Sequence, residues 1–232
     1  MKKAIKTLFI IILLSVALIS SYKVFITFYA YRQADKVYNH LREKKEISKE
    51  NTNSGIDLSN INKDYVCWIN IENTNIDYPI VQSKDNSYYL HRDIYRKYLY
   101  SGTIFIDYRC DYNKSKNLII YGHNMKNNTI FSEIERFKDK DFFYSNPKIT
   151  LTDKYKSSEY EVFAVILVNK NFDYRVCNFE NEDDYEKYLN KIINKSIYKS
   201  KNTPTSEDRI ITLTTCSYEF DNARTVVFAK QK

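Results

Sequence analysis

The chain is poor in the residues that bind metal ions. Its 232 residues include only three histidines and four cysteines, and no two cysteines form a C-x-x-C pair. Zinc sites in proteins are built from closely spaced pairs of these residues. We therefore expect no metal site, and we expect no cofactor.

A concentrated run of basic residues is also absent. The formal net charge is +7, but the lysines and arginines are scattered along the chain. Segments that bind nucleic acid gather such residues on one face or in one stretch. We therefore expect a solvated basic surface and no nucleic-acid partner.

The four cysteines lie at positions 67, 110, 177 and 216. An even number allows two disulfides in an exported domain, but a domain of this size does not need such crosslinks. We therefore expect mostly free thiols, with a disulfide between Cys110 and Cys177 as an open alternative. Cys67 precedes Trp68 inside an apolar strand, and we expect it in the core.

The amino-terminal segment has the composition of a membrane anchor. Residues 7–31 contain a single charge, Lys23, and three lysines precede them. A bilayer needs about 20 apolar residues, and basic residues favour the cytoplasmic side. We expect residues 1–31 to be a single-pass signal anchor, with the rest of the chain outside the cell. A peptide cleaved near Ala17 is the alternative, but the hydrophobic stretch continues past Ser20.

A charged segment follows the anchor and is expected to form a stem. Residues 32–57 contain four apolar residues at helical spacing, namely Ala34, Val37, Tyr38 and Leu41. The turn-rich segment 51–57 ends this stem and marks the boundary to a globular domain over residues 58–232. With 43% hydrophobic and 16% aromatic residues, the chain can bury a core.

The globular part alternates short apolar segments with polar turns. Eight of these segments are rich in Val, Ile, Thr, Tyr or Phe: 66–71, 76–82, 103–107, 117–121, 148–152, 159–168, 209–215 and 224–230. Eight strands are enough to close a small barrel, so we expect a mainly β fold with peripheral helices. We predict a helix over 181–200, capped by Asn181, and a shorter one over 130–140.

Two strand ends carry reactive side chains. The segment 118–125 leads an apolar strand into Gly122 and His123, and the segment 209–224 leads another into Cys216 before a new strand opens with Arg224. A cysteine thiol has a pKa near 8.5 and needs a partner base to become a useful nucleophile. A histidine can accept that proton, and an arginine can stabilise the oxyanion that forms. A small core cysteine is the alternative interpretation.

The chain resembles the sortase family, and its further motifs resemble class B. TLTTC at 212–216 is similar to the nucleophile strand of the family, YGH at 121–123 to its histidine strand, and Arg224 opens the last strand as the family arginine does. The class B motifs are W-I-x-I at 68–71, NIDYPIVQ at 75–82, DNSYYL at 85–90 and GTIFIDYR at 102–109. The resemblance covers about residues 60–230.

The resemblance implies a closed eight-stranded barrel that anchors exported proteins to the Gram-positive cell wall. Cys216 would attack the Thr carbonyl of a C-terminal NPxT-like sorting motif, with His123 as acid/base and Arg224 as oxyanion or backbone ligand. The thioester would pass to an amine of peptidoglycan or of its lipid-linked precursor. The matching positions for the substrate groove are Asn86, Leu90, Tyr121, Thr214 and Thr215. Plain core packing is the alternative for Leu90 and Tyr121.

Other classes remain in competition with this interpretation. Papain-like wall hydrolases place their cysteine before the histidine, whereas His123 precedes Cys216 here. Cysteine L,D-transpeptidases keep a His-Gly pair just before the nucleophile, and Cys216 has none. The alternative from another class is a non-catalytic, membrane-tethered barrel that binds a wall or protein partner. His40 is assigned to the stem, and His91 to a solvated surface or the groove.

Overall fold

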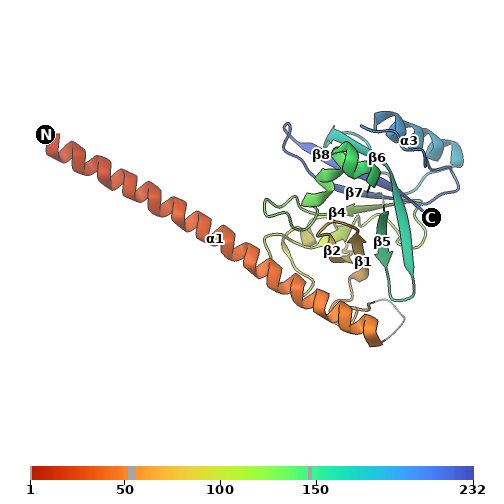
Figure 1. The fold of residues 1–232 in the computed structure, drawn as a ribbon, viewed down its shortest axis with the longest axis horizontal. Helices are drawn as coiled ribbons and strands as arrows, with labels where there is room; N and C mark the ends of the chain where they lie inside the picture. Colours follow the sequence, from red (N-terminus) through yellow and green to blue (C-terminus); the bar gives the residue numbers. More distant parts are fainter. Residues whose placement is uncertain (1, 52–55, 146–147) are drawn as a thin grey trace.

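The computed structural model describes residues 2–51, 56–145 and 148–232 (Figure 1). A long amino-terminal helix, α1 (Lys2–Asn51), leads to a β-barrel. The predicted linker over 51–57 lies partly outside the described residues. Within the described part, α1 is a single helix through both the predicted anchor and the predicted stem.

The β-barrel is closed, as predicted. Its strands are β1 (Tyr65–Ile71), β2 (Asp77–Val81), β3 (Ile104–Ile106), β4 (Asn117–Tyr121), β5 (Lys148–Thr152), β6 (Ser157–Asn169), β7 (Ile210–Cys216) and β8 (Ala223–Gln231). They pair in the order β1-β2-β3-β4-β7-β8-β6-β5. Each strand lies within two residues of its predicted limits, because β-branched and aromatic runs bounded by polar turns fix where pairing begins and ends.

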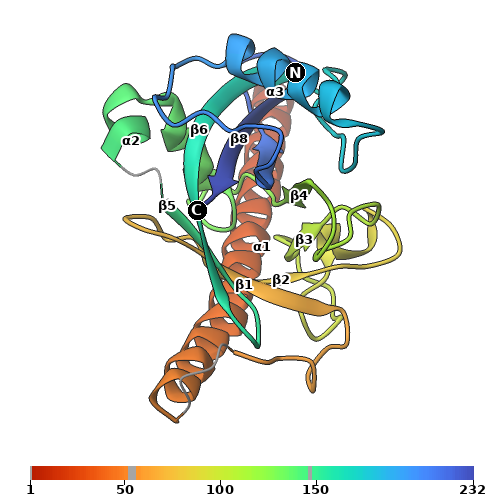
Figure 2. The ribbon, with the colours of Figure 1, turned by 90° about the vertical axis from the view of Figure 1, so that its right-hand side faces the viewer.

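The peripheral helices differ in part from their predictions. Asn181 caps α3 (Glu182–Lys195) by accepting a hydrogen bond from the Asp184 amide at 2.9 Å, but α3 ends before the predicted residue 200. Figure 2 shows α3 over one end of the barrel, near β6 and β8. The single helix predicted over 130–140 is instead two elements, the 3₁₀ helix η2 (Ser132–Lys138) and α2 (Lys140–Ser145). Asp139 separates them, because its backbone is extended and its carboxylate caps α2 at the Phe142 amide. A further 3₁₀ helix, η1 (Tyr88–His91), was not predicted.

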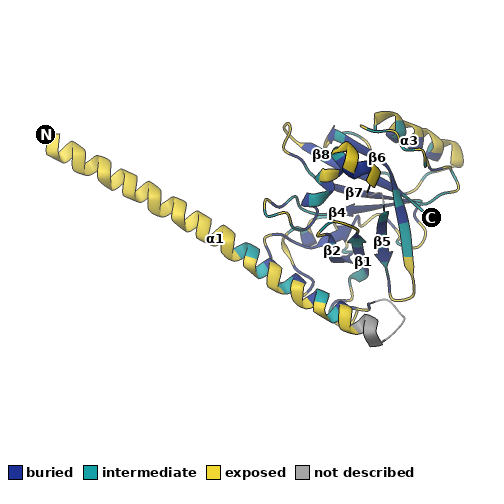
Figure 3. Cartoon of the chain, viewed as in Figure 1, coloured by how far each residue is buried: buried dark blue, intermediate teal, exposed yellow. Residues whose placement is uncertain are grey.

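The carboxyl-terminal part of α1 packs on the barrel, as the predicted stem face requires. Ala34, Tyr38 and Leu41 are buried against the barrel core, whereas α1 is exposed over residues 2–29 (Figure 3). The Tyr38 hydroxyl donates to the Gly102 carbonyl, and the Lys45 ammonium pairs with Asp77. The division into anchor, stem and barrel domain stays a prediction.

Candidate active site

Strand register brings the three predicted reactive residues to one edge of the barrel. β4 runs parallel to β7 with Tyr121 opposite Thr214, and β7 runs antiparallel to β8 with Cys216 opposite Arg224. Continuing the β4–β7 register by two residues sets His123 beside Cys216. Strand pairing fixes Cys216 and Arg224, whereas His123 follows the end of β4 and its carbonyl accepts a hydrogen bond from the Phe131 amide at 3.1 Å.

A cavity of about 240 Å³ opens at this edge. Its walls include all of the residues predicted for the site: His123, Cys216, Arg224, Asn86, Leu90, Tyr121, Thr214 and Thr215. Leu90 and Tyr121 are only partly buried and face the cavity as well as the core. The cavity therefore brings residues far apart in sequence to one site, where they could act together on a bound peptide.

The imidazole of His123 is held in one orientation. Its Nε2–H donates to the Leu90 carbonyl at 2.9 Å, since a carbonyl can only accept. The lone pair of the neutral ring is then on Nδ1. Burial lowers the pKa of His123, the hydrogen bond to Leu90 opposes this, and the neighbouring His91 adds to the lowering. A neutral imidazole at neutral pH is the form that can accept a thiol proton.

Two side chains brace the strand ends that carry His123 and Cys216. The Thr215 hydroxyl donates to the Gly122 carbonyl at 2.7 Å, and the Asn124 amide donates to the Cys216 carbonyl at 2.8 Å. Cys216 itself is a free, partly exposed thiol. Because the hydroxyl proton of Thr215 is already donated to a backbone carbonyl, this geometry suits a positioning role better than direct contact with an oxyanion.

Arg224 presents a guanidinium at the cavity wall. Its Nη1 donates to the Ala223 carbonyl at 2.8 Å, which fixes one end of the planar group. In the part of the chain that the structure describes, no carboxylate forms an ion pair with it. A guanidinium without a resident anion can offer its remaining N–H groups to a developing oxyanion or to a peptide carbonyl.

A buried carboxylate, Asp107, fixes two of the predicted groove residues. It accepts hydrogen bonds from the Asn86 amide at 3.0 Å and the Tyr121 hydroxyl at 2.8 Å, and it pairs with Arg109 at 2.8 Å. Burial alone would raise the pKa of the Asp107 carboxyl, but the Arg109 guanidinium and the Tyr121 hydroxyl hold it below its ordinary value. Asp107 lies within the GTIFIDYR motif, but the motif gives no sign of this central role.

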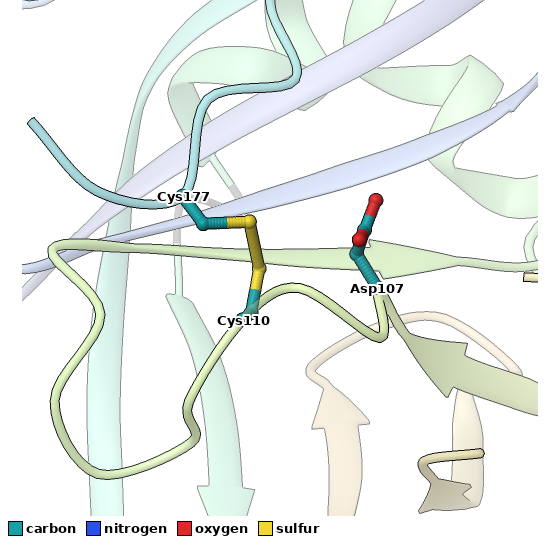
Figure 4. A group of neighbouring side chains, drawn as sticks. All are labelled: Asp107, Cys110 and Cys177. Atoms are coloured by element: carbon teal, nitrogen blue, oxygen red, sulfur yellow. A yellow bond between two sulfur atoms is a disulfide. The ribbon is translucent and has the colours of Figure 1, made fainter. Parts of the chain in front are cut away.

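The expectation of mostly free thiols is wrong for two of the four cysteines. Cys110 and Cys177 form a disulfide, 67 residues apart in sequence (Figure 4). Asn117 brings their two loops together by donating to the Cys177 and Val176 carbonyls, a long-range contact that spacing cannot reveal. Asp107 lies beside both sulfurs, but bonded sulfurs are not thiolate ligands, so this cluster is no metal centre as it stands. Cys67 is buried in the core as predicted, and burial raises the pKa of its thiol.

Three further residues line the cavity that were not predicted from the sequence. Lys170, Tyr174 and Arg175 come from the connection between β6 and α3 and also line the cavity. Hydrogen bonds hold this segment in place. The Tyr174 hydroxyl lies 3.0 Å from that of Thr214, the Arg175 guanidinium donates to the Lys170 carbonyl at 3.0 Å, and the Lys170 amide donates to the Asn222 carbonyl at 2.8 Å. His91 is exposed, as expected, and also lies next to the site, since its ring stacks on His123 at 5.5 Å.

Comparison with known proteins agrees with this geometry. Residues 69–232 match the model of the sortase domain. The chain is 36% identical to sortase B of Listeria monocytogenes over 231 residues, which covers 95% of this chain and 94% of that protein.

Solved structures of sortase B are similar to this chain as well. Sortase B of Clostridium perfringens is 44% identical, has a TM-score of 0.74, and is matched over 75% of this chain and 97% of its own. A Staphylococcus aureus sortase B–substrate complex has a TM-score of 0.81 at 31% identity, over 87% of this chain and 97% of that one. A sortase B complexed with triglycine has a TM-score of 0.81 at 32% identity, over 87% and 98% of the two chains.

Proposed function

Because the chain belongs to the sortase family as a class B cysteine transpeptidase, we propose that Cys216 is its nucleophile, with His123 as the acid/base and Arg224 as the oxyanion ligand. The pairing of Cys216 with Arg224 in the β7–β8 ladder carries this proposal. This pairing places the thiol and the guanidinium on neighbouring strands, where the carbonyl group of one peptide bond can contact both.

The reaction divides into two acyl transfers. His123 accepts the Cys216 proton at Nδ1, and the thiolate attacks the carbonyl of the scissile bond while Arg224 stabilises the oxyanion. Collapse of the tetrahedral intermediate breaks the C–N bond of the scissile peptide. His123 returns its proton to the leaving amine, and the acyl group stays on Cys216 as a thioester. A second amine attacks the thioester, loses its proton to His123, and releases the thiol.

The substrate is a C-terminal NPxT-like sorting motif of an exported protein, cleaved after Thr. Five cavity residues form its groove: Asn86, Leu90, Tyr121, Thr214 and Thr215. The hydrogen bonds of Asn86 and Tyr121 to Asp107 support this assignment, because preorganised polar groups bind a peptide with less loss of side-chain entropy. The likeness to a sortase B–substrate complex supports it further.

The acceptor is an amine of peptidoglycan or of its lipid-linked precursor. The similar sortase B complexed with triglycine supports an acceptor with a free amino end. The helix α1 contains an apolar window long enough to cross a membrane. Lys2, Lys3 and Lys6 favour a cytoplasmic amino terminus, so the barrel faces the cell wall.

Mass spectrometry of the full chain with a pentapeptide library tests the proposed function. Detergent-solubilised protein is offered peptides that vary around NPxT, first without and then with triglycine. We expect an acyl adduct on Cys216 without triglycine and a Thr–Gly product with it. A chain that binds these peptides with no adduct on any cysteine would instead be the non-catalytic barrel.

A further inference from the structure

Four large aromatic side chains are exposed on two segments beside the candidate active site, one that follows η1 and one that follows Cys216. Tyr98 is 77% exposed, Tyr100 50%, Tyr218 70% and Phe220 44%. We call these four residues the aromatic rim. Isolated exposed aromatic residues are common, but several at the entrance of a site mark a surface that meets something other than bulk water.

The rim is connected to the candidate active site. The His91 ring lies 6.3 Å from Tyr98 and 6.4 Å from Tyr100, and its stacking on His123 continues the row of rings. On the other side, the Tyr218 hydroxyl donates to the Asn124 carbonyl at 3.1 Å, and Asn124 holds Cys216. Whatever the rim contacts is therefore next to the reacting groups.

The rim also lies close to α1. Tyr31 of α1 is partly buried and packs against the barrel core, so the barrel surface begins at this residue. Partial burial raises the pKa of Tyr218, and so do its neighbours Cys216, Tyr100 and Tyr31. Figure 1 shows the β7–β8 connection, which carries Tyr218 and Phe220, on the side of the barrel that faces the amino-terminal half of α1.

The length of α1 relates these residues to a bilayer. A hydrocarbon core of about 30 Å takes roughly 20 helical residues at about 1.5 Å each. If it begins at Thr7, after the three lysines, it ends at about residue 26. A headgroup layer of roughly 5–7 Å then covers about four more residues and ends near Tyr31. The exposed Phe25, Phe28 and Tyr29 fall where membrane helices carry their aromatic belt.

We propose that the aromatic rim lies in the headgroup layer of the membrane that α1 spans, so that the site receives its peptide at the lipid surface. This inference rests on the membrane anchoring in the proposed function. Tyrosine suits that layer because its ring is apolar and its hydroxyl is polar. The rim does not enter the hydrocarbon, since the β7–β8 connection also contains Glu219, paired with Lys138, and Asp221.

Fluorescence quenching in vesicles tests the position of the rim. The full chain is reconstituted in phosphatidylglycerol/phosphatidylcholine vesicles as Tyr98→Trp, Phe220→Trp or the control Tyr155→Trp. Tyr155 is 81% exposed, and its β5–β6 turn lies at the opposite end of the barrel (Figure 1). The signal of the unsubstituted protein, from the buried Trp68, is subtracted. We expect a headgroup spin label to quench the fluorescence of Tyr98→Trp and of Phe220→Trp at least threefold more than that of Tyr155→Trp. Equal quenching at all three positions overturns the proposal.

Turnover measurements separate a lipid contact from a peptide contact. The variant Tyr98→Ser/Phe220→Ser is expected to keep its kcat/KM for a soluble sorting peptide in detergent. For the same peptide linked to a lipid in the vesicles, we expect a loss of roughly fivefold or more. Equal losses with both peptides would make the rim part of the peptide groove and would overturn the proposal. The quenching result does not depend on turnover, so an inactive Cys216 would refute the proposed function without deciding the position of the rim.

Discussion

The cavity has two walls that are held in different ways. The strand wall, formed by β4, β7 and β8, carries Cys216 and Arg224 in paired strands and His123 two residues beyond the end of β4. The loop wall, residues 170–177, is held by the Cys110–Cys177 disulfide and by side-chain hydrogen bonds such as that of Tyr174 to Thr214. Strand pairing leaves little freedom, whereas a loop held at a few points can shift. We therefore expect the chemistry to depend on the strand wall and the fit of the substrate to depend on the loop wall.

The largest expected effect is the loss of the nucleophile from the strand wall. Cys216→Ala should lower transpeptidation by at least about 10⁴-fold, because no other thiol lines the cavity. Peptide-adduct formation and turnover of a fluorogenic sorting peptide measure this. Cys67→Ala is the control. Cys67 is a buried free thiol, so this variant should still form the adduct on Cys216. Adduct formation by Cys216→Ala would assign the chemistry to another residue.

Replacing one arginine on each wall tests whether the strand wall controls kcat and the loop wall controls KM. Arg224→Lys keeps the charge but loses the planar fork, so kcat should fall by about 10²–10³-fold with an unchanged thermal melt. Arg175→Lys, on the loop wall, should change KM by a few-fold and leave kcat nearly unaltered. Steady-state kinetics with melting curves distinguish the two. Similar losses of kcat in both variants would abolish the distinction between the walls.

Removing the disulfide should loosen the loop wall alone. In Cys110→Ser/Cys177→Ser the free energy of unfolding should fall by about 2–4 kcal/mol, as expected for a bond that closes a long loop. KM for the sorting peptide should rise several-fold, while kcat should change less than twofold. Urea titration and steady-state kinetics measure these quantities. A large drop in kcat with KM unchanged would show that the loop wall positions the reacting groups.

The smallest effect is a pH dependence of stability from His123. Burial keeps its folded-state pKa below the ordinary value of 6.5, so the unfolded chain binds more protons as the pH falls through this range. The free energy of unfolding should therefore decrease from about pH 6.5 down to the folded-state pKa. His123→Gln should remove this part of the slope. Urea titrations at pH 7.5, 6.5 and 5.5 compare the two proteins, and identical slopes would contradict the prediction.

The strand wall could be predicted from the sequence, and the loop wall could not. Apolar runs ending at His123 and Cys216 mark strand ends, and both strands of a pair follow from the same local pattern. Tyr174 and Arg175 lie in a segment without regular structure, where no periodicity indicates which side chains face inward. The role of Asp107 was equally hidden, because its partners Asn86 and Tyr121 are 21 and 14 residues away.

The disulfide has a further consequence for oxidation chemistry. All four cysteines lie in the described part of the chain, two are bonded to each other, and Cys67 is enclosed in the core. Cys216 consequently lacks a resolving thiol within its own chain. A peroxide would oxidise its thiolate to a sulfenic acid, and exchange with a small disulfide would give a mixed disulfide. Neither product can be resolved by another thiol of the chain. Recovery of the nucleophile would then depend on a small thiol or a reductase that can enter the cavity.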